Sequence, residues 1–280
     1  MTFKGDSGAF LGMERLSAMT QKDISSSTPD RLGFSDGGAI SSRTAMFDEL
    51  MALLSAVPAA AEAQSYRQAI LDENVLHKAT ASNREKTFKF LRRLYALDPH
   101  VCLFREMRRL SRYAADDNKL LIGLLAMARE PILRECLGMV LKTPIGESLG
   151  RAQFESWIRA HAPARYSESM FVSFSHNLYA SFYQFGYLGE AVGKARTRVR
   201  PKSGITSVTY AAFLDWVHGK SGIALLHGTY SRALDLGADE HLALLQAAGR
   251  QGLLKVGYSG GVLDLAFSGF LKSNESRLIP

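Results

Sequence analysis

Lysine and arginine side chains, which bind phosphate oxygens readily, are concentrated in two segments of the sequence. Residues 82–112 contain nine of them against three acidic residues, and residues 194–202 contain five and no acidic residue. The whole chain of 280 residues has a net charge of only +7, so the remaining residues are net acidic. Positive charge gathered in this way is typical of a protein that binds a polyanion through electrostatic contacts with phosphates.

The first basic segment has the spacing of two consecutive amphipathic helices. At about 100° per residue, the second helix has its cations on one side and its apolar residues on the other: Arg105, Arg108, Arg109 and Arg112 against Leu103, Phe104, Met107 and Leu110. The first helix repeats the pattern, with Lys86, Lys89 and Arg93 against Phe88, Leu91 and Leu94. One such face alone favours a solvated surface without a partner. With two such faces and a further acid-free segment, a binding surface and a merely solvated surface are equally good interpretations.

The second basic segment alternates cations with other residues. Its arginines and last lysine are two positions apart, so an extended backbone would place them on one side. Phosphate contacts position a protein on DNA but carry little sequence information. We therefore expect binding to double-stranded DNA with little or no sequence specificity. The candidate residues are Lys86, Lys89, Arg93, Arg105, Arg108, Arg109, Arg112, Arg196, Arg198, Arg200 and Lys202.

Motifs for catalysis or metal binding are present only as near matches. Residues 146–150 fit the G-x-S-x-G pattern, but that motif requires a sharp strand-to-helix turn, and Ser148 is predicted in a loop between helices. Residues 219–221 resemble the end of a phosphate-binding loop, but Leu214 replaces its first glycine. The seven histidines and two cysteines have no metal-ligand spacing. We expect no enzymatic activity, no catalytic residue, no cofactor and no metal.

Composition is that of a globular protein in a reducing compartment. Hydrophobic residues make up 46% of the chain and charged residues 22%, both ordinary values. The longest apolar run, residues 120–128, is far shorter than the ~18 residues of a membrane span. The N-terminus shows no secretory signal. These features predict a cytoplasmic protein with no membrane partner.

Periodicity predicts a mainly α protein with several parts. Residues 1–43 are rich in Ser and Gly without a sustained apolar period, so a flexible N-terminal tail is expected. Residues 44–193 have the pattern of a helical bundle, in which a capping box at Ser82 and Glu85 begins one helix. Residues 194–202 are predicted to be a basic connector, and residues 272–280 a C-terminal tail.

Residues 203–271 have the element order of a winged-helix-like module. Three helical patterns, over 208–217, 223–234 and 239–250, precede two alternating runs around Gly260 and Gly261 that predict a C-terminal β-hairpin. The third helix begins with Asp239 and Glu240, and its only cation is Arg250. We therefore expect this module to mediate packing or protein contacts rather than base recognition.

A second class of function remains open. An interaction scaffold would dock its basic faces on acidic partner proteins and would bind DNA only incidentally. The acidic start of the helix over 239–250 favours this alternative. The two interpretations differ in whether the two basic segments form one continuous surface of duplex dimensions.

A family resemblance rests on several stretches between about residues 40 and 271. They are residues 70–82 with Arg84 and Thr87, 91–95 with 97–99, 103–105 with 108–110, the apolar stretch from 120 to Pro131, and 234–236 with 250–254 and the hairpin at 260–261. Together these stretches resemble the BrxA family of bacterial BREX phage-defence systems. The resemblance implies a NusB-like helical domain and a non-enzymatic accessory component of a defence locus. It also implies nucleic-acid binding and other defence-system proteins as partners.

Overall fold

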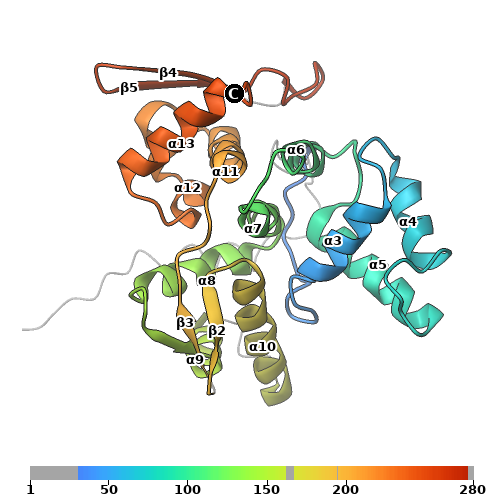
Figure 1. The fold of residues 1–280 in the computed structure, drawn as a ribbon. Helices are drawn as coiled ribbons and strands as arrows, with labels where there is room; N and C mark the ends of the chain where they lie inside the picture. Colours follow the sequence, from blue (N-terminus) through green and yellow to red (C-terminus); the bar gives the residue numbers. More distant parts are fainter. Residues whose placement is uncertain (1–30, 162–166, 194, 277–280) are drawn as a thin grey trace, which may run out of the picture.

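Helices dominate the computed structural model, which describes residues 31–161, 167–193 and 195–276 (Figure 1). The prediction of a mainly α fold is confirmed. The helices are α3 (Phe47–Ala56), α4 (Ala63–Leu71), α5 (Ala81–Tyr95), α6 (Cys102–Leu110), α7 (Asn118–Arg129), α8 (Pro131–Lys142), α9 (Arg151–His161), α10 (Glu168–Gln184), α11 (Ile205–Val217), the 3₁₀ helix η1 (Gly222–His227), α12 (Thr229–Ala233) and α13 (Ala238–Arg250). The strands are β1 (Ser148–Gly150), β2 (Leu188–Val192), β3 (Ala195–Arg198), β4 (Lys255–Ser259) and β5 (Val262–Ala266).

The second basic segment contains the central strand of a three-stranded antiparallel sheet. The strand order is β1-β3-β2, with Thr197 of β3 opposite Ser148 and Arg198 opposite Leu188. The extended conformation that the alternation predicted is therefore found. The prediction of an exposed connector is wrong for residues 195–198, because strands flank β3 on both sides. Lys194 lies outside the described residues.

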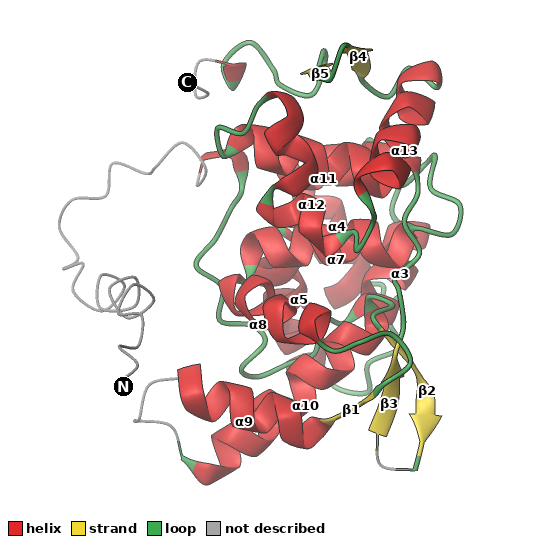
Figure 2. Cartoon of the chain, turned by 90° about the vertical axis from the view of Figure 1, so that its left-hand side faces the viewer, coloured by secondary structure: helices red, strands yellow, loops and turns green. Residues whose placement is uncertain are grey.

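The predicted C-terminal hairpin is present. β4 and β5 pair from Lys255 opposite Ala266 to Ser259 opposite Val262. Gly260 and Gly261 in the turn have φ angles of 57° and 81°, which a tight hairpin favours and which glycine adopts without strain. Figures 1 and 2 place this hairpin at one end of the molecule and the three-stranded sheet at the other. The assembly of α11–α13 and the hairpin as a winged helix stays a prediction.

Helix α5 begins earlier than its predicted capping box. Thr80 is the N-cap, and its hydroxyl accepts a hydrogen bond from the backbone N–H of Asn83. Ser82 therefore lies inside the first turn, and the Ser82–Glu85 cap is wrong. Thr80, two positions upstream, can cap a helix as well as Ser82 can, so residue type alone does not show which of the two is the N-cap. The helix ends at Tyr95 because Ala96 adopts a φ of 67°.

A continuous core runs from the N-terminal helices into the C-terminal ones, with α7 at its centre. Every residue of α7 from Leu120 to Ala128 is buried, and the helix packs against α5, α6, α8 and α11. The hydroxyl of Tyr210 on α11 donates to the carbonyl of Leu103 on α6 over 2.9 Å. The predicted bundle and the C-terminal module thus share one hydrophobic core, while the boundaries drawn between them stay predictions.

The segment before α3 is folded into this core. Leu32 and Ile40 are fully buried, and the buried carboxylate of Glu130 accepts the backbone N–H groups of Gly38 and Ala39 over 2.9 and 2.6 Å. The prediction of a flexible tail is therefore wrong for residues 32–43, and residues 1–30 lie outside the described part. The sequence did not indicate this, because the backbone N–H groups here are hydrogen-bonded to a side chain some 90 residues away.

None of the helices within the described ranges combines the length and the hydropathy needed to span a bilayer.

His241 on α13 predicts a loss of stability in acid. Its side chain is buried, its Nε2 has no hydrogen-bond partner in the described part of the chain, and burial lowers its pKa to about 4. The unfolded chain takes up this proton near pH 6.5, so stability should fall as the pH drops from about 6.5 to 4, by up to about 3 kcal/mol. Denaturant unfolding at about pH 7 and 4.5 measures the loss.

The matched variant for this test is His241→Leu, which removes the titrating group. It should lose less stability than the wild type over the same pH interval. Burial raises the pKa of Glu106, Glu130 and Asp215, which has the opposite effect on stability and is common to both proteins. Equal losses in the two proteins would show that His241 does not cause the acid sensitivity.

Candidate nucleic-acid interface

Helix α5 presents a row of free cations on its outer face. The side chains of Lys86, Lys89 and Arg92 are exposed and make no ion pair with any described residue. Arg93, also exposed, donates from Nε to the carbonyl of Gly37 over 2.6 Å. Neighbouring positions three and four apart share one helix face, so these cations form a single stripe, the α5 stripe. Sequence analysis found three of them but missed Arg92.

The opposite face of α5 explains why the stripe points outward. Leu91, Leu94 and Tyr95 are fully buried, and α5 packs against α4 and α7 through this side. The hydroxyl of Tyr95 donates to the carbonyl of Ala45 over 2.6 Å, which fixes the helix to the segment before α3. Burial of one face leaves the α5 stripe facing solvent on the outer side of the molecule (Figure 1).

The arginines of α6 are in contrast engaged within the fold. Arg105 forms a bidentate pair with Glu275 over 2.9 and 2.7 Å, and its Nε donates to Glu106 over 3.1 Å. Only 19% of its side chain is exposed, so Arg105 is not available to DNA. Glu275 itself is buried, so the predicted C-terminal tail is wrong for residues 272–276, and residues 277–280 lie outside the described part.

Arg108 closes the C-terminal end of α3. Its terminal nitrogen donates to the carbonyls of Leu54 and Val57 over 2.6 and 2.5 Å. Helix ends leave such carbonyls without intrahelical partners, and a cation also suits the negative end of the helix dipole. The candidate role in DNA binding is therefore replaced by a structural one for Arg108.

Arg109 and Arg112, at and just after the end of α6, differ in how many contacts they make within the fold. Arg109 donates from Nε to Glu106 over 2.7 Å and lies 4.4 Å above the ring of Phe270, with a third of its side chain exposed. Arg112 follows the helix, is exposed and makes no ion pair with a described residue. The helical wheel correctly placed these side chains opposite the core, but the C-terminal segment covers part of that side.

The four described cations of the second basic segment, Arg196, Arg198, Arg200 and Lys202, each have an acidic partner. Arg196 lies 3.6 Å from the ring of Tyr183 and pairs with Glu190 over 3.7 Å. Arg200 pairs with Glu240 over 3.3 Å, and Lys202 with Asp116 over 3.2 Å, both at exposed positions. Such surface pairs are weak and can open.

Arg198 is the candidate residue whose predicted DNA contact disagrees most clearly with the structure. Its side chain is 1% exposed, pairs with Asp235 over 2.6 Å, and donates from Nε to the carbonyl of Val140 over 3.1 Å. A phosphate cannot reach it in this conformation. Alternation placed it correctly on a strand, but alternation does not show which face of the strand other elements cover.

The two basic segments do not share a surface. Figure 1 shows α5 on the right of the molecule and β3 at the lower left. The candidate residues thus fall into two groups. Lys86, Lys89 and Arg112 are exposed without an ion pair to a described residue, whereas the side chains of the other described candidates have partners within the fold. The helix α5 and the strand β3 therefore lie on different parts of the molecule.

Ser148 lies in strand β1 rather than in the loop that the sequence predicted, and α9 begins directly after Gly150. The strand-to-helix order of a hydrolase elbow is therefore present, but no hydrogen bond joins the Ser148 hydroxyl to a histidine within the described ranges. Across the same ranges, no cluster of three His, Cys, Asp or Glu side chains is arranged to hold a metal ion.

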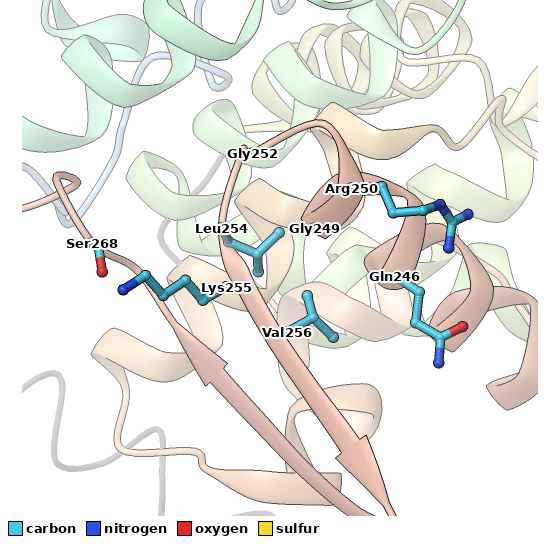
Figure 3. Close-up of a pocket in the computed structure, with 8 residues that line it drawn as sticks. All are labelled: Gln246, Gly249, Arg250, Gly252, Leu254, Lys255, Val256 and Ser268. Atoms are coloured by element: carbon cyan, nitrogen blue, oxygen red, sulfur yellow. The ribbon is translucent and has the colours of Figure 1, made fainter.

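A hollow of about 800 Å³ is lined by residues at the end of α13 and in β4 (Figure 3). Arg250 and Lys255 line it together with Leu254 and Val256, and no carboxylate lines it. At the other end of α13, Asp239 and Glu240 are exposed. The helix therefore offers little positive charge outside this hollow.

Comparison with known proteins identifies the family. No curated protein matches the chain. A crystal structure of an uncharacterized protein from Magnetospirillum magneticum is 17% identical, covers 60% of this chain and 88% of its own, and has a TM-score of 0.43. The BrxA family model matches residues 38–195, which is more than half of the sequence. This protein therefore belongs to the BrxA family.

Proposed function

We propose that this protein is a non-enzymatic DNA-binding accessory component of BREX phage defence, acting in the cytoplasm. Membership of the BrxA family indicates a BREX phage-defence protein. The observation that carries the DNA-binding proposal is the α5 stripe, where Lys86, Lys89 and Arg92 are exposed and free of ion pairs.

The dimensions of the stripe suit phosphate contacts on one strand. Lys86 and Arg93 are seven residues apart, or about 10 Å along a helix axis. Successive phosphates of one strand advance about 3.4 Å along the duplex, so the stripe spans about three intervals and reaches about four phosphates. Contacts of this kind hold the backbone and do not read bases. The protein should therefore bind duplexes of unrelated sequence with similar affinity.

Salt dependence tests the proposal on the wild-type protein. Four neutralised phosphates should give a slope of roughly −3 to −4 in a plot of log affinity against log salt concentration. Fluorescence anisotropy with two labelled duplexes of unrelated sequence measures both the slope and the specificity. An affinity that does not change with salt, or the absence of binding below about 0.1 M salt, would contradict the phosphate-contact mechanism.

The interaction scaffold remains the second candidate, and one observation favours it. The two basic segments lie on different parts of the molecule, so only one of them serves a single straight duplex. The hollow beside β4 adds a surface with Arg250 and Lys255 on which an acidic partner could dock. Under this alternative, defence-system proteins would co-purify with the chain after nuclease treatment, while the purified protein would leave duplex DNA unshifted.

A further inference from the structure

The arginines of α6 gather around a recess that the α5 stripe does not include. Arg105, Arg108, Arg109 and Arg112 line a cavity of about 200 Å³. Its other walls are apolar and come from the loop after α3, from Pro99 and from Phe104. Four arginines from little more than two helical turns thus line one small recess.

Several nitrogens of these guanidinium groups lack an acceptor within the described part of the chain. The guanidinium of Arg109 donates only from Nε, to Glu106, and that of Arg112 has no acceptor among the described residues. Arg108 uses one terminal nitrogen for the α3 carbonyls, and its guanidinium also interacts with the hydroxyl of the buried Tyr66. Arg105 is saturated by Glu106, Glu275 and the carbonyl of Phe270. Arg109 and Arg112 therefore keep donors at the recess without an acceptor among the described residues.

The charges around the recess do not cancel. The four arginines contact two carboxylates, those of Glu106 and Glu275, and the cavity lining itself contains no acidic residue. Glu106 is 1% exposed and already shared between Arg105 and Arg109. An excess of two positive charges remains, and it matches the charge of a phosphate monoester near neutral pH.

We propose that this recess binds a phosphate monoester dianion, presented either by a free small molecule or by the 5′ end of a nucleic-acid strand. Guanidinium groups recognise phosphate oxygens through paired N–H donors. The volume is below the range of about 300–1,000 Å³ for drug-sized ligands, so it accommodates the phosphate and a small part of the group attached to it. The apolar wall at Phe104 and Pro99 contacts that attached part.

This site is separate from the proposed α5 interface. Internal phosphates of a duplex are diesters with one charge each and lie on a convex surface, whereas the recess is concave and offers two charges. The inference therefore does not depend on α5 binding DNA, and either can fail without the other.

Calorimetric titration of the full-length protein with inorganic phosphate tests the site. The main variant is Arg112→Glu, because Arg112 is exposed and makes no contact that holds the fold. We expect saturable binding by the wild type and an affinity at least about 10-fold lower for the variant, since a charged hydrogen bond contributes about 1.5–3 kcal/mol. The variant Lys86→Ala/Lys89→Ala/Arg92→Ala should bind phosphate like the wild type.

Two labelled oligonucleotides of one sequence, with a 5′-phosphate or a 5′-hydroxyl, distinguish the two sources of the ligand. Tighter binding of the phosphorylated strand, abolished by Arg112→Glu, assigns the site to strand ends. Phosphate binding without this preference assigns it to a small molecule. The proposal is overturned if inorganic phosphate does not bind saturably at millimolar concentration, or if Arg112→Glu leaves its affinity unchanged. It is equally overturned if the triple α5 variant loses phosphate binding to the same extent.

Discussion

Replacing Arg198 with methionine should lower the free energy of unfolding by about 3 kcal/mol. Removing one partner of a buried ion pair costs about 3–5 kcal/mol, and the lower end applies because 26% of the Asp235 side chain is exposed. The carbonyl of Val140 would also lose one of its two donors and keep the backbone N–H of Thr143. Methionine keeps most of the apolar stem of arginine. Denaturant unfolding monitored by circular dichroism measures the change.

The matched control is Arg200→Met, two residues along the same segment. Half of the Arg200 side chain is exposed, as is that of its partner Glu240. Exposed pairs contribute little, so this variant should change stability by less than about 0.5 kcal/mol. A loss of under about 1 kcal/mol for Arg198→Met would refute the structural role of Arg198 and return it to the candidate binding residues.

Removing the free cations of the α5 stripe should have the largest effect on DNA binding. In the variant Lys86→Ala/Lys89→Ala/Arg92→Ala, three phosphate contacts are lost. Each contributes about 0.9 log units of affinity at about 0.1 M salt, so duplex affinity should fall by a factor of about 10² to 10³. Thermal stability should change little, because all three side chains are exposed. Anisotropy titration at a fixed salt concentration measures the loss.

The control for this variant removes the same charge elsewhere. Lys220, Arg232 and Lys255 are exposed and make no ion pair with any residue in the described ranges. Their replacement by alanine lowers the net charge by the same three units. A fall in affinity as large as that of the α5 variant would show that DNA responds to total charge rather than to the α5 stripe.

Local patterns predicted the helices, because amphipathic spacing records which side of each helix is buried. The helix α7 is apolar on all sides and is the central helix. The hairpin followed from two alternating runs around Gly260 and Gly261. These elements depend on neighbouring residues, and a single sequence contains that information.

Whether a cation is free or paired within the fold depends instead on residues far away in the sequence. The partner of Arg105 is Glu275, 170 positions away, and that of Arg198 is Asp235. A helical wheel shows that Arg105 lies opposite the core, but it does not show that the C-terminal segment covers that side. Lys86 and Lys89 of the α5 stripe were predictable because no segment in the described ranges covers them.

The tail prediction failed for a related reason. Residues 32–43 have few apolar residues and no period, and burial of their backbone depends on the carboxylate of Glu130. A segment held by polar contacts of this kind has no hydrophobic signature. Its apolar core residues are Leu32, Phe34, Ala39 and Ile40, and their spacing follows neither a helical nor a strand period.

The central claim is that the α5 stripe contacts DNA phosphates while the buried arginines of α6 and β3 hold the fold. The most direct measurement is the salt dependence of duplex affinity for three proteins: the wild type, the triple α5 variant and the triple control variant. The α5 variant should have a slope less steep by about 2.5 to 3, and the control should keep the wild-type slope within about 1 unit. An unchanged slope for the α5 variant would contradict the account.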